Sequence, residues 1–341
     1  MPWSVAWERA AFGPDGFYSD GPGARLWPAR FFRTSVHVGA VFHAAIAALL
    51  LEVDTRLGRP ERLDVVDVGA GSGELLPGLL DALPDDVARR VRGVAVDVHP
   101  PPDDLDRRVR WIVGTAPDAV PRGVRGLLVA NEWLDDVPLD VVEVDDEHVP
   151  RLVLVDTYGD ECLGPSLHDP QAWAAWGLDA ARAQEWLARW WPLAEGPEAR
   201  PGARAEIGTT RDDAWRAVVD RLEAGTALAI DYGHHRGPGR RPTLTGYRLA
   251  GRVVPAVPDG SVNLTAHVAV DSVAEAVGAR KGIRRQRESL VGLGVSAALP
   301  ASTLAAHDPS AYADALVAAS DAAELLDPSG LGAFTWVRLD R

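Results

Sequence analysis

The sequence predicts an α/β fold with a mostly parallel central sheet. Short apolar runs, such as LDVVDVG from Leu63 and GVAVDV ending at Asp97, alternate with stretches of helical periodicity such as ELLPGLLDAL. Parallel strands need crossover connections, which helices supply, so this alternation is typical of such a sheet. The length of 341 residues also fits one large domain of this class with insertions.

Residues 1–60 are expected to form an N-terminal helical cover. The segment before Thr34 is rich in glycine, proline and aromatic residues and shows little periodicity. Thr34 and Ser35 offer N-cap oxygens to the apolar stretch 38–53. This stretch is too short to cross a membrane, so we expect a buried helix and no membrane insertion. We also expect no secretory signal, because no basic flank precedes an apolar core.

An inserted subdomain is expected at residues 151–205, where the strand RLVLVDTY and a Trp-rich helical stretch interrupt the alternation. The flanking segments, 61–150 and 206–341, would then form the main ligand-binding domain. Within the second segment we expect a helix over residues 211–225, capped by Gly225, followed by the strand TALAIDYG. FTWVRL, residues 334–339, is expected to be a last edge strand.

The Trp-rich stretch has tryptophans at spacings of three and four, which place most of them on one helical stripe. A core or dimer contact is favoured over a ligand platform, so a homodimer is possible. These tryptophans are Trp173, Trp176, Trp186, Trp190 and Trp191.

The charge balance restricts the kind of partner. The chain has 49 acidic and 35 basic side chains and a net charge of −14, which argues against nucleic acid and favours a small molecule or a basic protein surface. The basic run ARKGIRRQR, residues 279–287, is expected to be a solvated strand and loop face. The one cysteine, Cys162, excludes an internal disulfide and is typical of a reducing cytoplasm.

The glycine loop in VVDVGAGSGELL is the main candidate for a ligand site. Gly69, Gly71 and Gly73 follow an apolar strand and allow a ligand to approach the backbone closely. Dinucleotide folds use G-x-G-x-x-G and place pyrophosphate at the following helix. Here Glu74 would repel that phosphate. S-adenosylmethionine has no phosphate, and its ammonium could be held by Asp67.

A second acidic position supports the same ligand. Asp97 ends the next strand, where a carboxylate can accept hydrogen bonds from both ribose hydroxyls, although a solvated strand-end carboxylate remains an alternative. Three glycines together with Asp67 and Asp97 favour S-adenosylmethionine over NAD or a purely structural turn.

Four further segments extend this pattern along the chain. They are FFRTSVHVGAVF (31–42), ANEWLDDVP (130–138), ALAIDYG (227–233) and GSVNLTAHVAV (260–270). With the glycine loop, they resemble the MidA-like S-adenosylmethionine-dependent methyltransferases, a group that includes a mitochondrial protein-arginine methyltransferase acting in assembly of respiratory complex I. The resemblance spans residues 17–339. It implies a class I methyltransferase fold with a seven-stranded, mostly parallel sheet, and a protein side chain, arginine, as acceptor.

Three positions depart from the family pattern. The family usually has Glu where this chain has His37, and acidic residues where it has Asn263 and Ala269. Because guanidinium recognition depends on carboxylates, these changes indicate either a changed substrate or lost activity. A non-catalytic assembly or binding protein is therefore a second hypothesis. An NAD-dependent oxidoreductase is a third, which Glu74 disfavours.

The segment ANEWLDDVP follows a strand, and in this fold the loop after that strand borders the methyl group. Asn131 is therefore expected to contact the cofactor and the acceptor. Glu132 is the best candidate to orient or deprotonate an acceptor nitrogen, the alternative being a cap on the next helix. Asp135 and Asp136 are expected to start that helix, where the macrodipole favours acidic residues.

Asp231 and Tyr232, at the end of the following strand, are expected to form the other wall of the acceptor site. His267 is either a base or hydrogen-bond donor to the acceptor or a buried, hydrogen-bonded histidine. The adjacent His234 and His235 cannot present both rings to one face, so we expect no metal site there.

Overall fold

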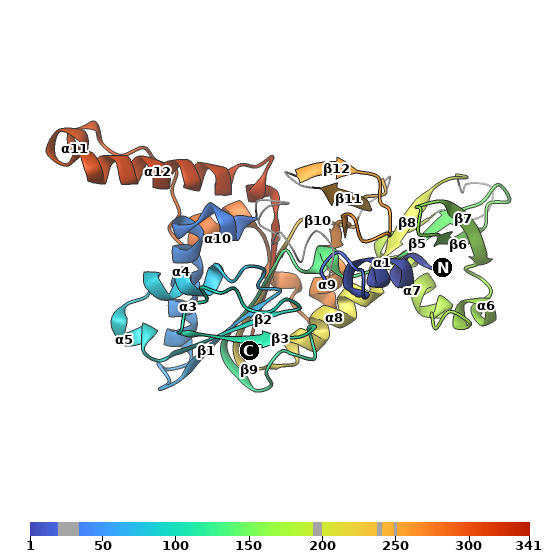
Figure 1. The fold of residues 1–341 in the computed structure, drawn as a ribbon, viewed down its shortest axis with the longest axis horizontal. Coiled ribbons are helices and arrows are strands. Elements are labelled where there is room, and N and C mark those ends of the chain that lie inside the picture. Colours follow the sequence, from blue (N-terminus) through green and yellow to red (C-terminus); the bar gives the residue numbers. More distant parts are fainter. Residues whose placement is uncertain (20–33, 194–199, 237–240, 249–250) are drawn as a thin grey trace. The chain divides into compact units, whose positions relative to one another are not determined.

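The computed structural model of the chain describes residues 1–19, 34–193, 200–236, 241–248 and 251–341, and it divides into two compact units (Figure 1). Unit 1 comprises Met1–Phe32, Leu134–Arg216 and Gly233–Val277; unit 2 comprises Arg33–Trp133, Ala217–Tyr232 and Gly278–Arg341. Residues 20–33, with the start of the FFRTSVHVGAVF segment, and residues 194–199 of the predicted insertion lie outside the described residues.

Unit 2 is built on a seven-stranded sheet with the order β15-β16-β9-β4-β1-β2-β3. The five strands from β9 to β3 are parallel to one another, and β16 and β15 run antiparallel at one side. This confirms the predicted sheet. The strands are β1 (Leu63–Val68), β2 (Val91–Asp97), β3 (Val109–Val113), β4 (Val124–Asn131), β9 (Leu222–Asp231), β15 (Ile283–Arg285) and β16 (Thr335–Asp340).

Two sequence predictions about this sheet are wrong. The strand predicted at the edge, β16, lies between β15 and β9, because the basic run supplies a short strand that pairs outside it. The helix predicted to end at Gly225 is α8 (Thr209–Val219). Gly225 instead lies in β9 with φ +127°, where a Cβ would come within 1.9 Å of the Gly126 carbonyl oxygen. Glycine at this position therefore allows β9 and β4 to approach each other closely, and it does not cap a helix.

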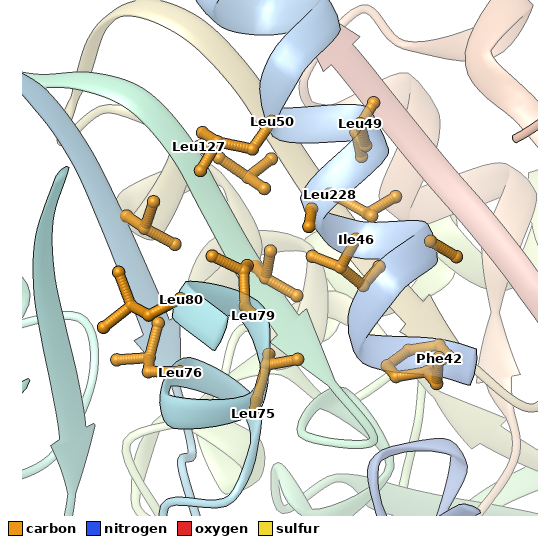
Figure 2. Packing of buried hydrophobic residues seen from close by; sticks show 14 of the residues in the cluster. Phe42, Ile46, Leu49, Leu50, Leu75, Leu76, Leu79, Leu80, Leu127 and Leu228 are labelled. Atoms are coloured by element: carbon orange, nitrogen blue, oxygen red, sulfur yellow. The ribbon is translucent and has the colours of Figure 1, made fainter. Parts of the chain in front are cut away.

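The core of unit 2 lies between the sheet and the helices α3 (Ala40–Arg56) and α4 (Leu75–Ala82). Figure 2 shows Phe42, Ile46 and Leu50 of α3 and the leucines of α4 meeting Leu127 of β4 and Leu228 of β9. The buried helix predicted at residues 38–53 is thus confirmed. Its N-cap is Gly39, because the short turn η2 (Ser35–Val38) comes first and Thr34 caps that turn instead.

The remaining helices of unit 2 are short, apart from one. They are α5 (Asp85–Ala88), η6 (Arg280–Gly282), α10 (Gln286–Gly292), α11 (Ser302–His307), α12 (Pro309–Leu326) and η7 (Leu331–Ala333). Among the described helices of the chain, none combines the length and apolar character that a membrane crossing requires.

Unit 1 contains three small sheets. Antiparallel sheets have the orders β7-β6-β5-β8 and β12-β11-β13, and β10 pairs with β14 in parallel. Its strands are β5 (Asp140–Val144), β6 (Pro150–Val155), β7 (Glu161–Ser166), β8 (Arg204–Ile207), β10 (Gly233–His234), β11 (Thr245–Arg248), β12 (Arg252–Val254), β13 (Asn263–Thr265) and β14 (Val268–Ala269). Its helices, besides most of α8, are α1 (Trp3–Phe12), η3 (Leu134–Asp136), α6 (Pro170–Ala174), α7 (Ala180–Trp190) and α9 (Val270–Ala276).

The helix α1 corrects the prediction of little periodicity before Thr34. Its buried residues, Trp3, Ala6, Trp7, Ala10 and Ala11, follow the spacing of one helical face. Residues 1–60 contribute α1 to unit 1 and α3 to unit 2. The predicted insertion, 151–205, lies within unit 1.

The Trp-rich stretch forms two helices, α6 and α7, with Gly177 at φ +76° between them. Four of its tryptophans are buried in the core of unit 1, and Trp176 is 43% exposed. This supports a core role rather than a ligand platform.

Candidate functional site

The glycine loop lies at the carboxyl end of β1, and all three glycines have positive φ: +71° at Gly69, +57° at Gly71 and +82° at Gly73. A Cβ at Gly71 would meet no atom within 4 Å. A Cβ at Gly69 would lie 2.8 Å from the Trp133 ring, and one at Gly73 would lie 2.9 Å from the Trp111 ring. Two of the glycines therefore make room for indole rings, and Gly71 is the one that borders open space.

Asp67, on β1 two residues before the loop, is 3% exposed. Its side chain has no hydrogen-bond partner among the residues that the structure describes. Burial, with added repulsion from Asp97 and Glu74, raises the pKa of Asp67 to about 8. A buried carboxylate without a donor or a counter-charge is costly in a protein. This position is therefore suited to a ligand that brings a cation.

Asp97, at the end of β2, is already hydrogen-bonded within the loop. One carboxylate oxygen accepts from the Gly71 backbone N–H at 2.8 Å; the other accepts from the His99 backbone N–H at 2.9 Å and lies 2.8 Å from His99 Nδ1. Asp97 therefore fixes the conformation at Gly71. The oxygen bonded to Gly71 retains a lone pair, so the predicted bond to a ribose hydroxyl stays compatible with this geometry.

Asn131 and Glu132 follow at the end of β4. The Asn131 side-chain N–H donates to Glu132 Oε1 at 3.2 Å, whereas Asn131 Oδ1 is buried and has no hydrogen-bond partner among the described residues. Glu132 has φ +52°, which is uncommon for a residue other than glycine and marks sites where strain serves function. Its carboxylate accepts from the Ser35 backbone N–H at 3.2 Å. Both predicted roles of Glu132, at the acceptor and as a cap on the next helix, stay predictions.

The turn η2 connects Glu132 to the start of α4 and to the far end of the sheet. Ser35 Oγ accepts from Gln286 at 2.9 Å, and Gln286 in turn accepts from the Trp336 indole at 3.0 Å. Two residues on in the same turn, His37 Nε2 lies 3.6 Å from Glu74 Oε1. Burial by itself would raise the pKa of Glu74. The interaction with His37 outweighs burial, so the pKa of Glu74 is lowered. A negative charge therefore stands where a dinucleotide fold would bind pyrophosphate.

Asp231 and Tyr232 do not share one face of β9. Ile230 packs into the core against α3, so Asp231, the next residue, points to the opposite face and is 3% exposed. Tyr232 follows the strand, and its ring lies 5.4 Å from that of Phe334. Their predicted role as a wall of the acceptor site stays a prediction.

His267 belongs to unit 1, together with the two lost acidic positions Asn263 and Ala269. The His267 side chain is exposed, so the alternative of a buried histidine is wrong, and its role as a base stays a prediction. Asn263 is buried, donates to Asp136 Oδ1 at 3.2 Å, and accepts from Tyr18 at 3.0 Å. An acidic residue there would face the Asp136 carboxyl.

Asp135 and Asp136 lie in the first turn of the short helix η3, which confirms the predicted helix start, and this helix has three residues. Thr265 donates to Asp135 at 2.8 Å, and the Tyr18 hydroxyl oxygen lies 2.5 Å from Asp136 Oδ2. Burial and the neighbouring Asp135 raise the pKa of Asp136 well above its usual range. These carboxyls belong to a hydrogen-bonded cluster in unit 1.

The histidine pair at the end of β10, His234 within the strand and His235 directly after it, is split between two contacts. The His234 ring packs on Trp191 at 4.9 Å, and His235 Nδ1 lies 2.9 Å from Asp271 Oδ1. Within the described ranges, no group of three or more His, Cys, Asp or Glu side chains could hold a metal.

The edge of unit 2 formed by β1, β2 and β4 fits S-adenosylmethionine. Gly71 borders open space, buried Asp67 has no hydrogen-bond partner in the part of the chain that the structure describes, and the negative charge of Glu74 disfavours a pyrophosphate. An ammonium group would satisfy Asp67, and the buried Asn131 Oδ1 is a second acceptor that receives no hydrogen bond from the described residues. Sequence reasoning missed Trp133 and Trp111, although Trp133 stands next to Glu132 in the quoted motif.

Comparisons with known proteins agree with this fit. A family model described as "Putative S-adenosyl-L-methionine-dependent methyltransferase" matches residues 45–289. A crystal structure from Burkholderia thailandensis, described as a "likely methyl transferase" bound to S-adenosyl-homocysteine, is 25% identical, with a TM-score of 0.73 over 100% of this chain and 88% of that chain. A native crystal structure of an uncharacterised protein from the same organism is also 25% identical, with a TM-score of 0.72 over 100% and 87%.

Comparison with curated proteins gives no match. The family match covers well over half of the chain, and the solved relative holds the demethylated form of the expected methyl donor. The NAD-dependent and non-catalytic alternatives are therefore not retained. The chain belongs to this family and is a class I methyltransferase that uses S-adenosyl-L-methionine.

Proposed function

We propose that this enzyme methylates a nitrogen of a protein side chain, with arginine as the acceptor. The observation that carries the proposal is Glu132, a carboxylate held at the end of β4 by the Ser35 backbone N–H and the Asn131 amide. The resemblance to MidA-like enzymes, with their link to assembly of respiratory complex I, supports arginine in particular. The single exposed cysteine, Cys162, supports a reducing compartment such as the cytoplasm as its place of action.

The bound S-adenosyl-L-methionine would supply a methyl group bonded to a positively charged sulfur. The acceptor nitrogen would bond to this methyl carbon as the carbon–sulfur bond breaks, and S-adenosyl-homocysteine would leave. Asp67 would hold the ammonium of this ligand. Asp97 and the backbone at Gly71 would line the space that the ligand occupies. Glu132 would orient the acceptor nitrogen and take the proton that this nitrogen loses on methylation. A guanidinium suits this role because it offers planar donors to a carboxylate.

Labelling tests the acceptor directly. The purified enzyme is incubated with methyl-labelled S-adenosyl-L-methionine and a lysate of its own source, and the labelled protein is hydrolysed to amino acids. We expect the label in methylated arginine. Label in lysine, in a carboxyl ester or in a small molecule would overturn the arginine proposal, and each of these would identify the acceptor class instead.

Glu132→Gln then tests the role of the carboxylate. A glutamine oxygen can still accept from Ser35 and Asn131, so the side chain should stay in place while losing its basicity. We expect methyl transfer to fall about 10²–10⁴-fold and affinity for S-adenosyl-homocysteine to stay within about twofold. The matched control is Glu223→Gln, an exposed glutamate of unit 2 that pairs with Arg125. Equal turnover in both variants would exclude Glu132 as the base.

A further inference from the structure

Unit 2 carries a helical arm, residues 299–321, that includes α11 and most of α12. Of these residues Ala319 alone is buried, and Leu299 and Val317 are 77% and 62% exposed. The later part of α12 packs against α3 and α10. Figure 1 shows α12, in red, leading away from these helices with α11 at its tip.

Such an arm is poorly stabilised by itself. α11 has 6 residues, and α12 begins with ten residues, 309–318, none of which is buried. Isolated helices of this length are marginal in water and draw most of their stability from tertiary packing of one face. The exposed apolar residues on the arm therefore indicate a surface that another protein covers.

The charge of the arm restricts what that protein can be. The sequence contains no lysine or arginine between Glu288 and Val337, and the arm carries Asp308, Asp314 and Asp321. Asp314 and Asp321 form no ion pair with any residue that the structure describes. The face that covers the arm must therefore be basic.

A basic face of this kind exists on the same unit. The basic strip, residues 280–287, runs through η6 and the edge strand β15 into α10. It exposes five cationic side chains: Arg280, Lys281, Arg284, Arg285 and Arg287. A groove of about 1030 Å³ lies beside it. Its lining includes Lys281, Arg284 and the apolar Leu293, and also the acidic Glu52, Glu288 and Asp340. Lys281, Arg284, Arg285 and Arg287 make no ion pair within the described ranges.

We propose that the arm of one copy of this chain packs on the basic strip and groove of a second copy, forming a homodimer. With a net charge of −14, two copies repel each other except where a concentrated positive surface meets a negative one. A two-fold arrangement would repeat the contact in both directions. It would also cover the edge strand β15, whose unpaired backbone groups otherwise invite aggregation.

Charge reversal on each side, separately and together, tests this contact. The arm variant is Asp314→Lys with Asp321→Lys, and the strip variant is Lys281→Glu with Arg284→Glu. Molar mass is measured by light scattering over a dilution series of the full chain. We expect the wild type to be a dimer. Each variant alone should raise the dimer dissociation constant by about tenfold or more, and combining both sets of substitutions should restore dimerisation.

The control is Asp85→Lys with Asp86→Lys, on exposed residues of α5, which makes the same charge change away from the arm and should leave the dimer intact. A monomeric wild type would overturn the proposal. A tighter dimer in the arm variant would also overturn it, because the arms would then pair with each other. Failure of the combined substitutions to restore dimerisation would overturn it as well. Misfolding cannot imitate recovery, because a second set of substitutions would not repair an unfolded arm.

Discussion

Asp67 in unit 2 and Glu206 in unit 1 are buried to nearly the same degree, 3% and 2% exposed, but their surroundings differ. Glu206 accepts three hydrogen bonds, from the backbone N–H groups of Thr243 and Leu244 and from the Thr243 hydroxyl. Asp67 accepts none within the described residues. A satisfied buried carboxylate stabilises the fold, whereas an unsatisfied one is a candidate for binding a ligand.

Unit 1 also contains a buried cation whose hydrogen bonds are satisfied. Arg211 of unit 1 is 1% exposed, and its guanidinium donates to four backbone carbonyl oxygens, those of Asp135, Val137, Ala266 and His267. Its place in unit 1 is thus structural. Substitutions in the two regions should therefore have opposite effects on stability and on ligand binding.

The largest expected effect is that of Arg211→Met, which removes the guanidinium and its hydrogen bonds to four backbone carbonyl oxygens. We expect the free energy of unfolding to fall by about 3–5 kcal/mol, measured by urea denaturation followed by tryptophan fluorescence. Arg211→Lys should recover only part of this loss, because an ammonium cannot reproduce the planar set of donors. A fully stable Arg211→Met would show that unit 1 does not depend on this cluster.

The second effect compares the two carboxylates directly. Glu206→Gln should lower the free energy of unfolding by about 1–3 kcal/mol, because an amide N–H would face one of the three donors. Asp67→Asn should leave stability unchanged or raise it, but weaken S-adenosyl-homocysteine binding about 10- to 100-fold through loss of the ammonium partner. Calorimetric titration and thermal melts separate the two. A destabilised Asp67→Asn with normal binding would reverse the comparison.

The smallest effect concerns Gly71. An alanine there would cost about 1 kcal/mol of stability because of its positive φ, and its methyl group would enter the open space beside the loop. Gly58→Ala is the matched control, since Gly58 also has positive φ and a Cβ there would meet no atom within 4 Å, but it lies after α3. Both variants should lose similar stability, and Gly71→Ala alone should lose cofactor affinity. Equal cofactor affinity in the two variants would mean that the cofactor does not bind beside Gly71.

The sheet and the glycine loop were predictable because their signals are local. The strands β1, β2, β4 and β9 appear as apolar runs, and glycines with positive φ follow β1 directly. Gly225 was misinterpreted because a glycine after a helical stretch is ambiguous by itself. Its role depends on Gly126, which approaches it from a neighbouring strand. The spacing of α1 was local as well, but its glycine- and proline-rich surroundings obscured it.

The chemistry around Glu132 could not be predicted in the same way. Its carboxylate is positioned by Ser35, 97 residues earlier, and Ser35 by Gln286, 251 residues later. Such contacts follow from the packing of distant elements, which no local pattern records. The absence of a partner for Asp67 among the described residues is likewise a property of the folded core. The sequence identified these side chains as candidates, and only the fold shows which of them are satisfied.

Proton release on ligand binding tests the assignment of Asp67 most directly. With a pKa of about 8, Asp67 is mostly protonated at pH 7 in the free enzyme, and a bound ammonium would favour its ionised form. Binding should therefore release about one proton at pH 7, and affinity should rise as the pH increases from about 6 to 8. Calorimetry in two buffers of different ionisation enthalpy measures this release. We expect it in the wild type and not in Asp67→Asn; the same release in both proteins, or none in the wild type, would contradict the account.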